Sequence, residues 1–164
     1  MKRILITLAV GAAVLSCATP TQQTRLDKAT KKHLTAQSVR KRIDSRHFTV
    51  DVATVSPKGA PLHHLSGGHT LHVSGDSLYS HLPYIGRVFS APYGGGKGLD
   101  FDATISEYRQ SRHNDSCTRI DIYCKNEEDS YHFLLWIFDN GTATIDVNAQ
   151  NRDTIGFGGQ LADR

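Results

Sequence analysis

From His47 onward, apolar and polar residues alternate in short runs separated by turn-forming residues. Successive side chains of a strand point to opposite faces of a sheet, so alternation with a period of two predicts strands. The runs lie at 48–52, 70–73, 78–82, 99–106, 119–124, 142–149 and 154–158, and residues 131–138 form a further run that is apolar on both faces. The stretch from Ser56 to Gly68 is rich in proline and glycine and predicts a loop. Together these runs predict an antiparallel β domain over residues 47–164.

The region before this domain has a different period. Between residues 24 and 46 apolar side chains recur near helical spacing, and no proline or glycine interrupts them. They are Leu26, Ala29, Ala36, Val39 and Ile43. The apolar stripe is thin. We therefore expect an amphipathic helix over residues 24–46 that leans on a larger surface and forms a single domain with the β part.

Asn140-Gly141 is the strongest hairpin signal in the chain. Asn-Gly favours a two-residue type I′ loop, in which both central residues have positive φ. With that loop Asp139 pairs with Thr142, which turns Leu134 and Trp136 toward the core. A second row of large apolar side chains then faces outward: Phe133, Leu135 and Ile137. Because a bare row of this kind would be an exposed apolar patch, we expect the N-terminal helix to cover it.

The first residues have the order of a secretory signal. Lys2-Arg3 precede an uncharged run over residues 4–15, which is shorter than the roughly 20 apolar residues needed to span a bilayer. Val14-Leu15-Ser16-Cys17 resembles a bacterial lipobox, and an ordinary signal peptide with a chance cysteine is the alternative. We expect a signal peptide over residues 1–16, lipidation of Cys17, and a polar tether over residues 17–23.

Acyl chains on Cys17 would anchor the protein to a membrane without spanning it. The next residue is Ala18 and no acidic run follows. In lipoproteins of similar type this pattern accompanies outer-membrane sorting without a surface-export signal. We therefore expect a lipid-anchored protein of the cell envelope, at the outer membrane and facing the periplasm.

Charge is divided unevenly along the chain. Residues 25–46 carry eight basic and two acidic groups, whereas residues 47–164 carry nine basic and fourteen acidic groups. A basic segment beside a lipid anchor could meet anionic headgroups at about 1 kcal/mol per Lys or Arg. The alternatives are a solvated helix face or docking onto the acidic domain. Nucleic acid is not an expected partner, because the compartment disfavours it.

The stretch from Leu82 to Phe101 is rich in residues that favour unusual backbone conformations. It holds two Pro-Tyr turns and a glycine-rich loop, and irregular loops on a rigid scaffold often carry function. Tyr and Arg are favoured where a surface binds, so Tyr84, Arg87 and Tyr93 are candidates for contact with a ligand or partner. The alternative is that they lock an unusual turn.

Several segments together carry a resemblance to a known family. They are Leu82-Pro83-Tyr84-Ile85-Gly86-Arg87, Ala91-Pro92-Tyr93-Gly94-Gly95, the Asn140-Gly141 hairpin and Asn151-Arg152. The chain resembles lipoproteins of Bacteroidales-type gut anaerobes that are catalogued as a domain of unknown function. The resemblance covers nearly all of the chain after the signal and implies a curled, antiparallel, lipocalin-like sheet or barrel behind an N-terminal helix. It adds Arg152 to the candidate contacts and brings no catalytic residues. Ile85 stands where the family pattern suggests Phe.

Motifs for catalysis and cofactor binding are incomplete. Gly96-Lys97-Gly98 lacks the Ser or Thr that a phosphate-binding loop needs, and Ser38-Val39-Arg40-Lys41 lacks the partner motifs of penicillin-binding enzymes. Asp100 and Asp102 have a spacing close to that of glycosidase carboxylates, but they lie on the polar face of a strand. We therefore expect no catalytic residues, no cofactor and no enzymatic activity.

Histidines and cysteines are the remaining candidates for metal or redox chemistry. His63, His64, His69 and His72 could supply imidazole to a metal, although no Cys, Asp or Glu lies among them and the last two point to opposite faces. We treat them as weak candidates and expect no metal site. Cys117 and Cys124 stand too far apart along one strand for a disulfide, and Cys124 is expected in the core.

Three function classes remain open. The first is a non-catalytic binding module for a small ligand, a glycan or an envelope protein. The second is a structural envelope protein that acts at the membrane or the cell wall, and an uncharacterised enzyme is the third and least favoured. A lined cavity inside the barrel would favour the first class, and a filled interior would favour the second.

Overall fold

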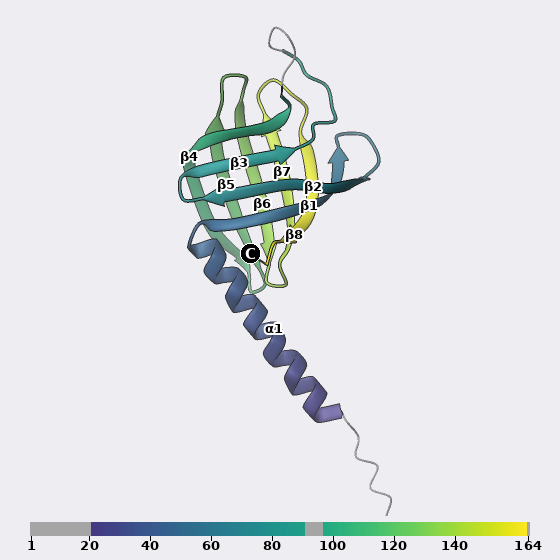
Figure 1. The fold of residues 1–164 in the computed structure, drawn as a ribbon, viewed down its shortest axis with the longest axis vertical. Helices are drawn as coiled ribbons and strands as arrows, with labels where there is room; N and C mark the ends of the chain where they lie inside the picture. The colour runs from purple at the N-terminus through teal and green to yellow at the C-terminus, as the bar shows by residue number, and fades with distance from the viewer. Residues whose placement is uncertain (1–20, 91–96, 164) are drawn as a thin grey trace, which may run out of the picture.

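The structure is a computed structural model that describes residues 21–90 and 97–163 (Figure 1). One helix precedes eight strands. In chain order these elements are α1 (Thr21–Asp44), β1 (His47–Pro57), β2 (His63–Ser74), β3 (Ser77–Leu82), β4 (Leu99–Asn114), β5 (Cys117–Lys125), β6 (Ser130–Phe138), β7 (Thr142–Ala149) and β8 (Ile155–Leu161). The predicted loop over 56–68 is thus shorter than expected, because β2 already begins at His63, and His63 and His64 pair with Val55 and Thr54 of β1.

The eight strands form a closed barrel in which neighbours in sequence are neighbours in space. Every pair is antiparallel, and β1 pairs with β8 to complete the ring. Each strand of the ring therefore has a neighbouring strand on both sides, and the sheet has no edge strand. The structure therefore confirms the mainly β fold, with an antiparallel barrel and an N-terminal helix. We call the end where α1 joins the barrel the base, and the opposite end the rim.

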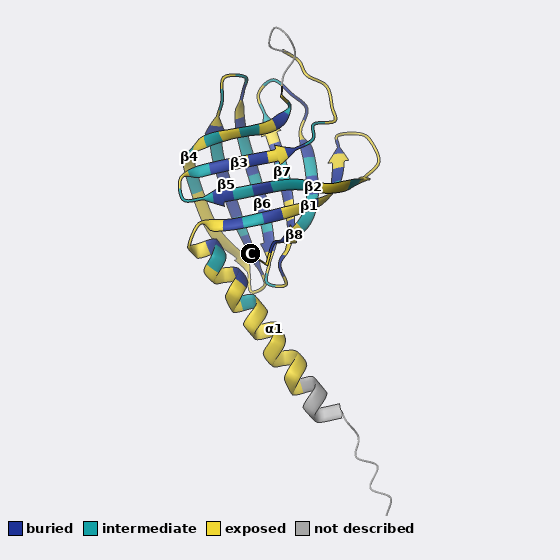
Figure 2. Cartoon of the chain, in the orientation of Figure 1, coloured by how far each residue is buried: buried dark blue, intermediate teal, exposed yellow. Residues whose placement is uncertain are grey.

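Buried residues alternate with more exposed ones along the strands of the barrel (Figure 2). The alternating inner positions of the strands are buried aliphatic and aromatic residues, and the rings of Phe101 and Tyr131 stack with centroids 4.5 Å apart. An eight-stranded barrel has an interior just wide enough for side chains to fill. The interior is therefore a packed core.

The β6–β7 hairpin differs from the expected register by one residue. Leu135 pairs with Ile145 and Ile137 with Ala143, so the row formed by Phe133, Leu135 and Ile137 lies inside the barrel and is fully buried. Gly141 N–H donates to the carbonyl of Phe138, and Gly141 has φ 86°. This is the three-residue loop with a left-handed glycine at its end, not a type I′ loop. Since the side-chain period is two, the longer loop exchanges the two faces.

The helix consequently has a different role from the one expected. Val39 and Ile43 are buried in the same apolar cluster as the barrel core, but they reach it from the base. Leu26 and Leu34 are more than half exposed, and α1 projects away from the barrel (Figure 1). The helix therefore closes the base with its last turns and covers no outer face. Within the described residues, no helix combines the length and the apolar character needed to cross a membrane.

Candidate functional site

Arg152, Tyr84 and Arg87 meet at the rim. Arg152 is almost fully buried and pairs with Glu128 at 2.8 Å and with Asp129 at 3.4 Å. Its guanidinium also donates to the carbonyl of Gly98 at 2.9 Å and lies 5.5 Å from the ring centre of Tyr84. Asp129 in turn accepts backbone N–H bonds from Ser130, Gln150 and Asn151. We call these residues the rim network.

Tyr84 and Arg87 join the β3–β4 segment to the turn before β8. The Tyr84 hydroxyl donates to the carbonyls of Arg87 and Asp153, and burial raises the pKa of Tyr84. Arg87 donates to the Asp153 carboxylate at 3.0 Å, and this bond holds the pKa of Asp153 below its ordinary value. These contacts are made within the chain, which supports the alternative that the residues lock an unusual turn. Tyr93 and Cys17 lie outside the described residues.

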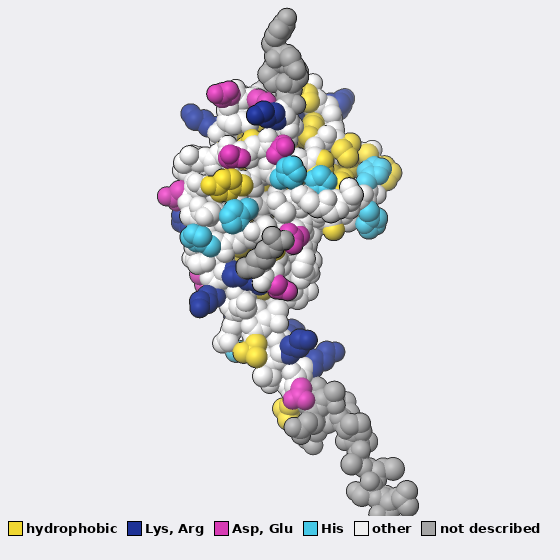
Figure 3. Space-filling view, viewed as in Figure 1, with side chains coloured by type: hydrophobic (Ala, Val, Ile, Leu, Met, Phe, Trp, Pro, Cys, Tyr) yellow, Lys and Arg dark blue, Asp and Glu magenta, His cyan; other side chains and the backbone are white. Residues whose placement is uncertain are grey.

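The histidines of β2 do not converge. His63 and His64 are exposed, His69 stacks on His81, and His72 bonds to the hydroxyl of Thr49 at 2.8 Å. In the described part of the chain no three His, Cys, Asp or Glu side chains form a group that could hold a metal ion. Figure 3 shows histidine side chains spread over the outer face of the barrel.

Both described cysteines are free thiols in buried positions. Cys124 belongs to the apolar core, as predicted from its place in the strand, and burial raises its pKa to about 12. A thiol with so high a pKa is almost entirely protonated near neutral pH and is a poor nucleophile. The cysteines therefore contribute packing, and the structure assigns them no redox role.

A groove lies on the outside of the barrel over β8. Its floor is β8, where Gly156 and Gly158 occupy successive outward positions. A Cβ on Gly158 would come within 2.6 Å of the Thr54 hydroxyl, and a Cβ on Gly156 would lie 3.3 Å from the Asp146 carboxylate. The missing side chains leave a depression between the outward residues of β1 and β7.

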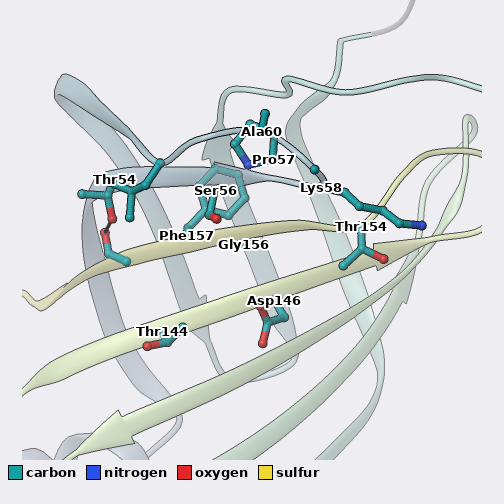
Figure 4. A pocket seen from close by; sticks show the side chains of 13 residues that line it. Thr54, Ser56, Pro57, Lys58, Ala60, Thr144, Asp146, Thr154, Gly156 and Phe157 are labelled. Carbon is teal, nitrogen blue, oxygen red and sulfur yellow. Dashed lines mark hydrogen bonds between the residues drawn. The ribbon is translucent and has the colours of Figure 1, made fainter.

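This β8 groove has a volume of about 760 Å³, and polar side chains stand among apolar ones in its lining (Figure 4). Four side-chain hydroxyls surround it, from Thr54, Ser56, Thr144 and Thr154. The β1–β2 loop forms one lip with Lys58, Ala60 and Leu62. Asp146 projects from β7 and is the single carboxylate of the lining, and burial raises its pKa.

A second hollow lies at the rim between β4 and the β5–β6 turn. It has about 830 Å³ and is lined by Lys97, Asp100, Phe101, Asp102 and residues 126–128. It adjoins residues 91–96, which lie outside the described part of the chain. Its outline is therefore incomplete, and the β8 groove is the candidate site.

Sequence reasoning missed the β8 groove. The only local signal is the run Gly156-Phe157-Gly158-Gly159, in which two glycines take alternate positions on one face of a strand. Glycine inside a strand often marks a close backbone approach, and Gly159 fits that reading, since a Cβ there would meet the Asp51 carbonyl at 2.2 Å. That the other two glycines open a groove depends on the side chains of β7, the preceding strand, and of β1, which is distant in sequence.

Comparison with known proteins identifies a family. Residues 30–161 match DUF4251, described as a domain of unknown function. The crystal structure of a DUF4251 family protein from Bacteroides eggerthii DSM 20697 has a similar fold, with a TM-score of 0.60 and 15% sequence identity over 78% of this chain and 87% of that one. No curated protein matches the chain.

Proposed function

The chain belongs to the DUF4251 family, and we propose that it is a non-catalytic binding module of the cell envelope that takes its ligand on the outside of the barrel. One observation supports this proposal above all. The β8 groove combines a glycine floor, four hydroxyls and one half-buried carboxylate in about 760 Å³. Ligand sites are concave and present a few convergent polar groups, and this groove has both properties.

The packed interior decides where a ligand could sit. Side chains occupy the inner positions from base to rim, so a ligand held inside the barrel in lipocalin fashion is not supported. An outer site needs no such cavity. The rim network is less suited to binding, because Arg152 and Asp129 are already buried and satisfied by one another and by backbone groups.

The envelope location remains part of the proposal. Lipidation of Cys17 at the outer membrane would place an anchor four residues before α1 begins. A 24-residue helix at about 1.5 Å per residue would hold the barrel up to about 36 Å from the anchor. Cys17→Ser should therefore release the full chain from the membrane fraction, and retention after a high-salt wash would contradict the lipid anchor.

The experiment that tests binding is co-purification from native membranes. Thr144 is exposed and lines the groove, so Thr144→Trp fills it without entering the core. Thr142→Trp is the matched control, because Thr142 is exposed on the same face of β7 and does not line the groove. Mass spectrometry should find one molecule retained by the wild type and by Thr142→Trp, and lost from Thr144→Trp.

Equal recovery of that molecule with Thr144→Trp would contradict a ligand in the groove. Absence of any retained molecule from all three proteins would favour the second candidate, a structural envelope protein at the membrane or cell wall. The packed interior and the exposed length of α1 favour that candidate. A strain that lacks the protein would then be restored equally well by wild type and by Thr144→Trp.

A further inference from the structure

Asp146 differs from the other aspartates whose side chains are partly or fully buried. In four of them the fold supplies the partners: Asp121 pairs with Arg119 and His132, Asp129 with Arg152, Asp139 with Arg40 and Arg112, and Asp153 with Arg87 and Lys58. Asp146 receives neither an ion pair nor a side-chain hydrogen bond from any residue in the described part of the chain. Burial without a partner disfavours a charged carboxylate.

The surroundings of Asp146 explain this isolation. Its strand neighbours are Leu134 on β6 and Gly156 on β8, neither of which carries a charge. Lys58 lines the same groove, but its ammonium lies 3.6 Å from Asp153, on the side away from Asp146 along the rim. The groove therefore presents one carboxylate that a bound cation could satisfy.

The barrel topology limits how a ligand could bind here. β8 pairs with β1 on one side and with β7 on the other, so its backbone groups are occupied. A peptide that binds as an added strand needs a free sheet edge, and this barrel offers none at β8. Recognition must therefore use side chains. The polar side chains of the lining are four hydroxyls, the Asp146 carboxylate and the Lys58 ammonium, which is already paired with Asp153.

We propose that the β8 groove binds a glycan that carries a free amino group, with its ammonium on Asp146 and its ring hydroxyls on the surrounding Thr and Ser side chains. The glycines of the floor leave room for a sugar ring to lie against β8. Hydroxyl side chains both donate and accept, so they match the hydroxyls of a sugar. This inference rests on the proposed binding function and names the ligand class of the same groove.

Calorimetry with the full chain in detergent near neutral pH tests the inference. The probes are a glucosamine tetrasaccharide, the N-acetylglucosamine tetrasaccharide, which lacks the ammonium, and tetralysine, which has ammonium groups without sugar. A hydrogen bond to a charged group should favour the glucosamine tetrasaccharide over its acetylated form by about ten- to a hundredfold. Asp146→Asn should lower its affinity to that of the acetylated form and leave the acetylated form unaffected.

Three variants distinguish an error in the ligand class from an error in the location of the site. Thr144→Trp should abolish binding of both sugars, and Thr142→Trp should change neither. Asp146→Asn should melt at or above the wild-type temperature, because it removes a carboxylate that burial disfavours. A loss of binding in a folded Asp146→Asn protein therefore reports recognition.

The possible results distinguish the two proposals. Equal binding of both sugars, unchanged by Asp146→Asn but lost in Thr144→Trp, would overturn the amino-group inference and leave the groove as a glycan site. Tighter binding of tetralysine than of either sugar would overturn the glycan class in favour of a cationic peptide. If no probe binds while the co-purified molecule still depends on Thr144, the ligand class is wrong and the groove remains the site.

Discussion

The two ends of the barrel are closed by different chemistry. At the base, Val39 and Ile43 extend the apolar core, and the guanidinium groups of Arg40 and Arg112 that pair with Asp139 there remain partly exposed. At the rim, Arg152 is buried with Glu128 and Asp129, and no helix covers it (Figure 1). The same barrel thus ends in an apolar plug on one side and in a buried ionic network on the other.

The difference between the two ends of the barrel predicts how mutations at each end alter stability. Buried ion pairs stabilise little in total, but removal of one partner leaves an uncompensated charge and costs several kcal/mol. Breaking an exposed ion pair lowers the free energy of unfolding only slightly. Truncating a buried apolar side chain lowers it by an amount that grows with the volume removed. The rim should therefore be most sensitive to loss of charge, and the base to loss of volume.

Arg152→Met gives the largest expected effect. It keeps much of the side-chain volume and leaves Asp129 and Glu128 without their cation, so the free energy of unfolding should fall by about 3–5 kcal/mol. Urea denaturation measures the change. The matched control is Arg87→Met, since Arg87 is 80% exposed and should lose less than about 1 kcal/mol. Similar losses in the two variants would contradict the buried network.

Ile43→Ala tests the base. Ile43 is 1% exposed within the apolar core, so its truncation should lower the free energy of unfolding by about 2–4 kcal/mol. Leu34→Ala, on the same helix but 60% exposed, should leave stability nearly unchanged. Thermal melts of both variants measure the contrast. A large loss for Leu34→Ala would mean that the outer length of α1 packs on a surface.

Gly141→Val tests the turn at the base that sets the β6–β7 register. Gly141 has φ 86°, and a Cβ there would lie 2.9 Å from the Gln160 amide, so the variant should lose about 1–3 kcal/mol. Gly67→Val is the control, because Gly67 has no positive φ and open space around its Cα. Equal melting temperatures for the two variants would show that the left-handed conformation is not required.

Asp139→Asn gives the smallest expected effect and depends on pH. The hydrogen bond from Arg40, and then those from Arg112, hold the pKa of Asp139 below its usual value. A lowered folded-state pKa adds stability above the unfolded pKa of about 3.9, and this stability is lost as the pH falls below that value. Wild type should exceed Asp139→Asn by less than about 1 kcal/mol at pH 7, and the difference should vanish in acid. Denaturation curves across this range test the sign, and a difference that grows in acid would contradict it.

Much of the fold was predictable because strand alternation is a local property. Most runs from β3 to β8 were found from their period, β6 was found as a run apolar on both faces, and the buried side of α1 was correctly placed at Val39 and Ile43. The end of β4 and the start of β2 were missed, since residues 107–114 and 63–68 lack clear alternation. These polar segments are strands because a long partner strand pairs with them.

The candidate site was less predictable than the fold. The sequence analysis named Tyr84, Arg87 and Arg152 as candidate contacts for a ligand or partner, and in the structure they contact one another and the turn before β8. Asp146 gave no signal, because an aspartate at a polar strand position is ordinary. Its isolation is visible only when the neighbours on β6, β8 and the β1–β2 loop are known.

The sequence by itself determined most of the strands, the place of the β6–β7 hairpin and the buried side of α1, since period, turn residues and side-chain type are local. Only the tertiary structure decided which face of β6 points inward. Residues 131–138 are apolar on both faces, so the local pattern is symmetric and the one-residue difference between two loop types selects the inner row. Closure of the ring brought β8 beside β1. The floor formed by Gly156 and Gly158 therefore lies next to the hydroxyls of Thr54 and Ser56, which are about a hundred residues away along the chain.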